Sequence, residues 1–190
     1  AAYNEYYNQV IARVEEKLQA IPPEERTRVY HAENQATRTI HESSLAADWS
    51  RAAGVINVSV GEELSLIKND YYASIEQILL WNPEVIIANE KTAVDLILGS
   101  PQWSGIEAVQ NGRVYLLPQG ISRWGHAGSV ETPLAILWTA KTVYPEIFAD
   151  VDMEAEVKYY YKSFFNIELS DGQVQQILSG VGLRKPKGES

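Results

Sequence analysis

Polar and charged side chains gather in three loops of the sequence, and each loop follows an expected strand. The strands are expected at 28–32, 84–89 and 113–117. In an open parallel α/β sheet, ligands bind beyond the carboxyl ends of the strands, so the three loops should meet at one edge. The side chains that they would bring there are Glu33, Asn34, Arg38, His41, Asn89, Glu90, Lys91, Gln119, Arg123, Trp124 and His126.

These side chains are suited to binding a solute. Arginine offers forked donors to an oxyanion, histidine can donate a hydrogen bond or ligate a metal axially, and tryptophan can stack on a flat ligand. The combination indicates an anionic metal chelate or an oxyanion as the ligand. Our candidate ligand-binding residues are Arg38, His41, Asn34, Arg123, Trp124 and His126.

The sequence carries no recognisable catalytic constellation. It has three histidines and no cysteine, which excludes a thiolate nucleophile, disulfides and thiolate metal sites. No metalloprotease, nucleophile-elbow, P-loop or dinucleotide-binding fingerprint is present. Adjacent carboxylates such as Glu62 and Glu63 are expected to be solvated. We therefore expect no catalytic residue, no cofactor, no metal site and no enzymatic activity.

The order of the elements predicts an α/β fold, a three-layer sandwich with a short, mostly parallel sheet, preceded by a long helix. Short apolar strands alternate with helices, which is typical of a parallel sheet covered on both faces. Residues 33–42 and 61–72 are expected to be irregular. Besides the three strands above, we expect a strand at 55–58 and helices at 1–20, 44–53, 74–81, 91–98, 130–144, 152–165 and 171–178.

Composition excludes some classes of partner. The net charge is −9 and the pI is about 4.9, so the chain lacks the basic footprint of a nucleic-acid-binding protein. It contains no apolar run long enough to span a bilayer. The chain opens on Ala1 with no Met start, signal peptide or lipobox, which we interpret as a fragment of a longer protein.

Several motifs together resemble the substrate-binding proteins of ABC importers for iron complexes, haem and cobalamin. Residues 72–87 contain Glu76 and Asn82-Pro83 before an apolar run, and are similar to a helix and strand of the family's second lobe. The resemblance covers about residues 20–180, and it is specific only when its motifs are taken together. The other matching segments are 52–57, 100–115 and 131–146.

The resemblance implies two α/β lobes joined by one long helix, with the ligand held between the lobes. Residues 1–22 would be the end of the connecting helix, 23–183 the C-terminal substrate-binding lobe, and 184–190 a disordered tail. An exposed apolar stripe would mark the surface against which the other lobe packs, and its residues would be Tyr3, Tyr7 and Val10.

The resemblance also implies a function and partners. The protein would be the extracytoplasmic solute-binding component of an ABC importer, in the periplasm or at the cell surface as a lipoprotein. It would deliver a ferric siderophore, haem, a corrinoid or an oxyanion such as molybdate to the permease. Glu76 matches the glutamate by which the second lobe docks on the permease, where an exposed charge steers association. Contact with the membrane would run through the permease or a lipid anchor outside this chain.

Two alternatives from other classes remain open at this point. Chelatases and nitrogenase-type cofactor proteins also use paired parallel α/β lobes, and a fold does not fix a function. A chelatase-like or metallochaperone domain would bind metal tightly through histidine and carboxylates. An interaction module would instead use Glu76 and the acidic surface to meet a protein partner.

Overall fold

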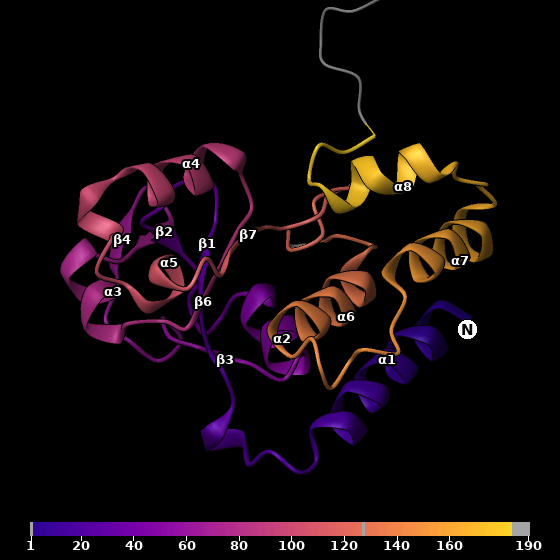
Figure 1. Ribbon diagram of the computed structural model, residues 1–190, viewed down its shortest axis with the longest axis horizontal. Helices are drawn as coiled ribbons and strands as arrows, with labels where there is room; N and C mark the ends of the chain where they lie inside the picture. The colour runs from indigo at the N-terminus through magenta and orange to yellow at the C-terminus, as the bar shows by residue number, and fades with distance from the viewer. Residues whose placement is uncertain (1, 127, 184–190) are drawn as a thin grey trace, which may run out of the picture.

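A mixed β-sheet runs through the molecule with helices on both of its faces (Figure 1). The computed structural model describes residues 2–126 and 128–183 of the chain. Within them the sheet order is β4-β5-β2-β1-β6-β7, with β3 also paired to β1. The strands are β1 (Arg28–Ala32), β2 (Arg38–Thr39), β3 (Ile56–Asn57), β4 (Ser65–Ile67), β5 (Asp70–Tyr72), β6 (Val85–Ala88) and β7 (Val114–Leu116).

The four strands predicted from the sequence form the parallel part of this sheet. Strand β1 pairs in parallel with β3 on one side and with β6 on the other, and β6 pairs in parallel with β7. The register places Ala32 opposite Ala88 and Ala88 opposite Leu116. The carboxyl ends of β1, β6 and β7 therefore reach the same edge, as the element order predicts.

The other three strands form an antiparallel ribbon, and the expectation that 33–42 and 61–72 are irregular is wrong for this part. Strand β2 pairs with β1 and with β5, and β5 pairs with β4. The β4–β5 turn uses Lys68 and Asn69 with φ of 50° and 68°. Such angles favour glycine or asparagine, so a turn with lysine at one position gives a weak hairpin signal.

Helices cover the two faces of the sheet in separate groups. On one face lie α1 (Ala2–Leu18), α2 (Leu45–Ala52) and α6 (Thr132–Val143), with α7 (Met153–Phe165) and α8 (Asp171–Leu178) packed beside them. On the other face lie α3 (Ile75–Trp81), α4 (Lys91–Gly99) and α5 (Glu107–Gln110). Two 3₁₀ turns, η1 (Pro23–Glu25) and η2 (Pro101–Trp103), complete the described elements.

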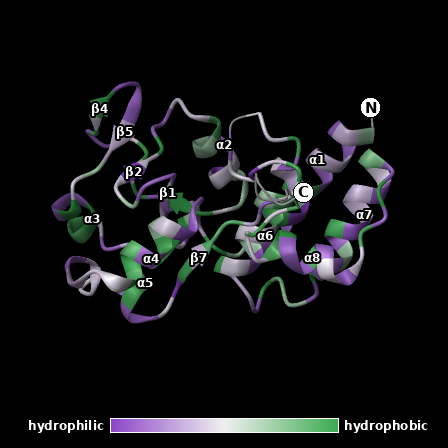
Figure 2. Cartoon of the chain, turned by 90° about the horizontal axis from the view of Figure 1, so that it is seen from above, coloured by the Kyte–Doolittle hydropathy of each residue, from purple (hydrophilic) through white to green (hydrophobic). Residues whose placement is uncertain are grey.

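The strands divide their side chains between two hydrophobic cores. Val85 and Ile87 of β6 pack into the core under α1, α2 and α6, whereas Ile86 and Ala88 pack into the core under α3, α4 and α5. This alternation follows from the period of two in a strand, and it confirms that this apolar run is covered on both faces. Figure 2 shows green, hydrophobic stretches in strand β7 and in parts of helix α6.

The long helix α1 packs onto the body more fully than expected. Its buried residues are Tyr6, Val10, Val14 and Leu18. Val10 is only 4% exposed, so it does not belong to an exposed stripe; Tyr3 and Tyr7 are half-buried. The reason is that α1 packs mainly against α6, and an aromatic cluster with α7 adds to this packing. In that cluster Tyr6 contacts Tyr160 and Phe164 at centroid distances of 5.5 and 5.4 Å.

Helix α1 ends at Leu18, close to the boundary predicted near Pro22. The expected tail at 184–190 lies outside the described residues. Among the residues that the structure describes, no helix has both the length and the apolar character that crossing a bilayer requires.

Candidate solute-binding rim

Arg123 joins the three predicted loops at the carboxyl edge of the sheet. Its Nη1 donates to Asn34 Oδ1 in the β1–β2 loop at 3.1 Å. Its Nη2 lies 2.6 Å from Glu90 Oε1, at the end of the loop after β6. The Arg123 side chain is 39% exposed. Arg123 itself comes from the segment between β7 and α6, which crosses the upper middle of the molecule in Figure 1. We call Arg123, Asn34 and Glu90 the rim triad.

Arg38 and His41 lie on the antiparallel ribbon. Arg38 forms ion pairs with Glu33 at 2.9 Å and with Asp70 at 2.7 Å. The His41 ring stacks on Tyr71 with a centroid distance of 4.4 Å and an interplanar angle of 11°. His41 Nδ1 accepts the backbone N–H of Ser43, which leaves the ring proton of a neutral imidazole on Nε2. These contacts place both residues within the ribbon and its flanking loops.

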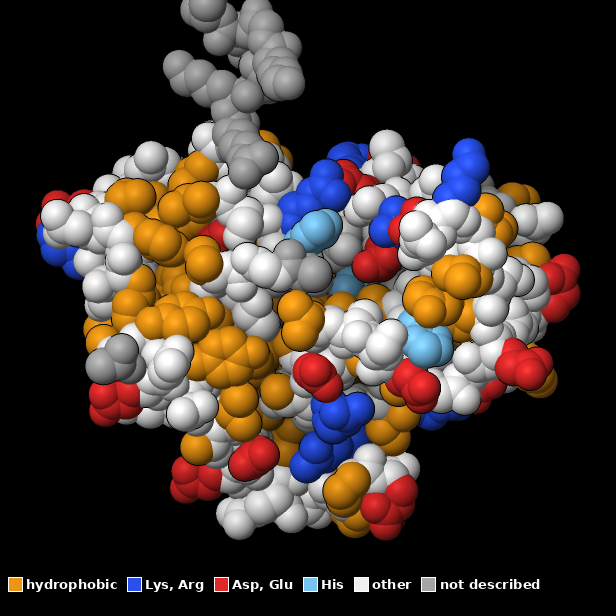
Figure 3. Space-filling model, turned by 180° about the vertical axis from the view of Figure 1, so that it is seen from behind, with side chains coloured by type: hydrophobic (Ala, Val, Ile, Leu, Met, Phe, Trp, Pro, Cys, Tyr) orange, Lys and Arg blue, Asp and Glu red, His pale blue; other side chains and the backbone are white. Residues whose placement is uncertain are grey.

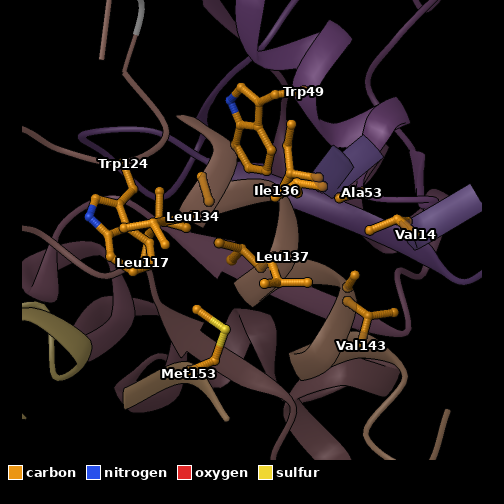
Figure 4. Close-up of a cluster of buried hydrophobic side chains, with 14 of the residues drawn as sticks. Val14, Trp49, Ala53, Leu117, Trp124, Leu134, Ile136, Leu137, Val143 and Met153 are labelled. Atoms are coloured by element: carbon orange, nitrogen blue, oxygen red, sulfur yellow. The ribbon is translucent and has the colours of Figure 1, made fainter. Parts of the chain in front are cut away.

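Trp124 lies in the core, so the expectation that it stacks on a ligand needs correction. Its side chain is 0% exposed. Figure 4 shows it pointing into the cluster that contains Leu117 and Leu134. Its indole Nε1 donates to Glu131 Oε1 at 3.1 Å. The residue is therefore an anchor for the loop that carries Arg123, because a buried indole with a satisfied N–H holds its backbone in place.

The anchor of this loop is the buried carboxylate of Glu131. Besides Trp124, the carboxylate accepts the backbone N–H of Ser122 at 2.7 Å, the Ser122 hydroxyl at 2.8 Å and the Tyr161 hydroxyl. Burial, followed by the hydrogen bond to Glu131, raises the pKa of Tyr161 above its ordinary value. Glu131 is 0% exposed, and within the described residues no cation pairs with it. Four donors satisfy its charge instead.

A second buried pair lies where β1 and β6 end. His31 Nε2 and Asn89 Oδ1 are 2.8 Å apart, and the His31 ring meets Trp49 edge-on. His31 Nδ1 is buried without a hydrogen-bond partner in the described part of the chain. Burial lowers the pKa of His31, although the hydrogen bond to Asn89 and the charge of Glu33 act in the opposite direction.

Gly125 packs closely against Asn89 of this pair, at a position with no room for a side chain. A Cβ at this position would meet Leu117 Cδ2 at 2.5 Å and Asn89 Oδ1 at 3.3 Å. The Trp49 indole also donates to the Gly125 carbonyl at 3.4 Å. The next residue, His126, is exposed, and its backbone N–H bonds the carbonyl of Arg123. Figure 3 shows histidine in pale blue beside blue lysine or arginine side chains in the upper middle of that face.

The sequence thus predicted the residues of the rim triad to lie at one edge, but it did not predict the buried Glu131 that holds the Arg123 loop in place. Asn34, Glu90 and Arg123 come together, while Lys91 pairs with Asp95 along α4 at 2.6 Å. Glu131 was missed because a glutamate at the start of a helix ordinarily indicates an exposed first-turn acid. The available signals were the position of Glu131 before a largely apolar helix and its place at the start of the family-like segment 131–146.

Glu76 lies away from the rim on the surface of α3. This helix begins with a capping box of Ser74 and Gln77, as the Ser-x-x-Gln spacing favours. Glu76 is exposed, and so are Leu79 at 39% and Leu80 at 84%. Residues three and four apart share a face of a helix, so one carboxylate and two leucines form one surface.

Comparisons of the sequence and of the structure with known proteins point to the same protein family. A model of the family described as periplasmic binding protein matches residues 1–120. The molybdate-binding protein MolA of Haemophilus influenzae is 30% identical over 152 residues, which are 79% of this chain and 42% of MolA.

Solved structures agree with that result. An ABC transporter solute-binding protein of Sulfurospirillum deleyianum superposes with a TM-score of 0.80 and 29% identity, over 93% of this chain and 55% of that one. MolA of H. influenzae bound to molybdate gives a TM-score of 0.75 and 27% identity, over 89% and 51%.

CeuE of Helicobacter pylori in complex with Ni-His gives a TM-score of 0.73 and 25% identity, over 93% and 55%. This chain spans about half the length of these relatives. The family and these relatives are solute-binding transport proteins and not enzymes. On the evidence of its parallel α/β lobe and of the family match over most of its length, the chain belongs to the periplasmic binding protein family.

Proposed function

We propose that this chain is the C-terminal lobe of an ABC importer's solute-binding protein, and that its rim binds an anionic solute. The observation that carries the proposal is the rim triad, because a partly exposed guanidinium is held where three loops meet. Among the solutes that the sequence left open, an oxyanion such as molybdate agrees best with this group. Support comes from MolA, which is named for molybdate binding.

The chemistry of Arg123 explains why an anion would bind there. A guanidinium has five N–H donors, and Asn34 and Glu90 each contact a different terminal nitrogen. Donors remain for a further oxygen, and forked donors match the geometry of an oxyanion. Glu90 keeps the cation oriented but also competes for it. A solute with two or more oxygens would share or displace Glu90, and the exposed His126, three residues after Arg123, is our candidate for a further donor.

Mapping the site by NMR tests this proposal on the chain itself. Molybdate is titrated into ¹⁵N-labelled protein at constant ionic strength, with chloride as the reference salt. We expect saturable shifts for amides of 33–38, 89–91 and 120–126. Arg123→Gln should abolish them, whereas Arg28→Gln, which removes an exposed arginine at the opposite end of β1, should leave them unchanged. Shifts that avoid these segments would overturn the rim as the binding site.

The same titration distinguishes the solutes that the sequence left open. Ni-histidine, a ferric siderophore, haem and a corrinoid are added in separate arms. A response of the rim amides to a metal complex, with none to molybdate, would replace the oxyanion by that complex. A response to none of them would contradict a solute-binding role for this rim.

Glu76 is our proposed contact with the permease. It lies on a capped helix beside exposed Leu79 and Leu80, and an exposed charge on a rigid element steers association while apolar neighbours add buried area. Glu76→Lys in the two-lobe protein should lower stimulation of the reconstituted transporter's ATPase severalfold with solute binding unchanged. Glu15→Lys, on the exposed side of α1, is the control. Equal stimulation by both variants would remove Glu76 from the interface.

A further inference from the structure

A cavity lined by apolar residues and two arginines lies at the amino end of the sheet, opposite the rim. It has a volume of about 320 Å³. The segment after η1, the end of α2 and strand β3 form its walls, and η1 and β3 lie at the lower end of the molecule in Figure 1. The lining residues are Pro23, Arg26, Ala47, Ser50, Arg51, Val55, Ile56, Asn57 and Val60.

Two donors in this lining have no partner among the described residues. Arg26 Nε and Asn57 Nδ2 are both buried without a hydrogen bond. The orientation of Asn57 follows from its other atom, since Oδ1 accepts the backbone N–H of Ser59 at 3.1 Å and the Ser59 hydroxyl at 2.8 Å. Asn57 is only 8% exposed. Buried donors in folded proteins are normally paired, so two unpaired ones lining one cavity indicate an acceptor that binds there.

The charge of the lining has one sign. It contains the guanidinium groups of Arg26 and Arg51 and no carboxylate. Arg51 pairs with Asp48 at 3.2 Å, but both side chains are about two-thirds exposed, at 68% and 67%. Arg26 takes part in no ion pair within residues 2–126 and 128–183. The cavity lining is thus positively charged although the whole chain has a net charge of −9.

Not every polar group in the lining is available to a ligand. The Ser50 hydroxyl donates to the Ala47 carbonyl at 2.9 Å, so its proton is already used. Glu24 and Glu25 of η1 are exposed and lie outside the lining. The available groups are thus the guanidinium donors and the Asn57 amide.

We propose that this cavity binds a small oxyanion of the phosphate, sulfate or carboxylate class. Arginine is suited to such groups because its planar fork presents parallel N–H donors, and the amide of Asn57 adds a further donor. An anion bound here would connect the segment that follows α1 to α2 and β3. The site is separate from the rim, which lies at the other end of β1.

Phosphate titration followed by NMR tests the proposal directly. Inorganic phosphate, sulfate and acetate are added in separate arms against chloride at equal ionic strength. We expect saturable shifts of the Arg26 Nε–H and Asn57 Nδ2 resonances and a rise in melting temperature, because a ligand that binds only the folded state stabilises it. The arm with the strongest response identifies which oxyanion the cavity prefers.

Variants separate this site from the rim and from general charge effects. Arg26→Gln should abolish the phosphate response, and Arg123→Gln should retain it, whether or not the rim binds a solute. Arg28→Gln makes the same change of charge on a neighbouring exposed arginine and should also retain it. Resonances of Arg26 and Asn57 that do not respond to any oxyanion, or an equal loss in Arg26→Gln and Arg28→Gln, would overturn the proposal.

Discussion

The two segments that frame the rim are held in opposite ways. The loop between β7 and α6 is anchored by a buried carboxylate, Glu131, with four donors around it. The β2–β5–β4 ribbon is held at its surface by the ion pairs of Arg38 and by the stack of His41 on Tyr71. Both segments carry residues that sequence analysis assigned to ligand binding.

The two segments should differ in how far they can move when a solute binds. Removing the acceptor from a buried network leaves several donors unpaired, whereas surface ion pairs are exchanged for water at little cost. We therefore infer that the loop presents Arg123 in a fixed position, and that the ribbon can move when a solute arrives. The predictions below test this contrast, from the largest expected effect to the smallest.

Loss of the Glu131 carboxylate should have the largest effect. In Glu131→Ala the Ser122 amide, the Trp124 indole and the Tyr161 hydroxyl lose their acceptor, which should lower the free energy of unfolding by about 2–4 kcal/mol. Urea denaturation measures the loss. Glu131→Gln keeps one acceptor oxygen and should be intermediate. A loss as small as that of a surface variant would mean that the loop is held by packing alone.

Trp124→Phe should lower the free energy of unfolding by less than Glu131→Ala does, because it removes only one donor and a part of the ring. We expect a loss of about 1–2 kcal/mol in the free energy of unfolding, from the same urea experiment. Trp103→Phe is the matched control, since Trp103 is 2% exposed in the other core. Its loss should report the change in ring volume. If the two variants lose equally, the bond from Trp124 to Glu131 contributes nothing measurable.

The buried His31 should make stability depend on pH on the acidic side. Burial lowers its folded pKa below the ordinary value of 6.5, so the unfolded chain binds the proton more readily. Stability from this group is therefore complete above the unfolded pKa and falls as the pH drops toward the folded pKa.

Urea denaturation at about pH 7.5 and about pH 5.5 measures this dependence, with a limit of about 1.4 kcal/mol per pH unit for one group. His31→Gln should flatten the difference between the two pH values. His126→Gln, at an exposed position, should leave it unchanged. A difference that persists in His31→Gln would assign the pH dependence to other groups.

The ribbon should give the smallest change. Arg38→Gln removes both ion pairs, whose side chains are between 24% and 32% exposed. We expect a loss of under about 1 kcal/mol in the free energy of unfolding, as is usual for ion pairs near solvent. A loss comparable with that of Glu131→Ala would show that the ribbon is as rigidly held as the loop.

Local sequence signals predicted the parallel sheet and the helix starts well. Ser44, Ser74 and Ser170 each cap the helix that follows, and the apolar run in β6 is buried on both faces. These features depend on neighbours in the sequence, so pattern and capping chemistry suffice.

Contacts that no local pattern signals account for the errors elsewhere. The ribbon was not predicted because β2 is only two residues long and the β4–β5 turn contains Lys68. Trp124 was assigned to the rim from its place in a loop, but a partner seven residues later, Glu131, draws its indole into the core. The place of Arg123 at this edge was predicted because the rule for parallel sheets names the edge where loops converge, and its role in binding a solute stays a prediction.

The most direct test of the central claim compares molybdate affinity in three proteins. The dissociation constant is measured for the wild type, Arg123→Gln and Glu90→Gln at one ionic strength. Arg123→Gln should weaken binding about tenfold or more, since it removes the forked cation, and Glu90→Gln should tighten it severalfold by removing a competing carboxylate. Unchanged affinity in both variants would contradict a rim in which Arg123 receives the solute.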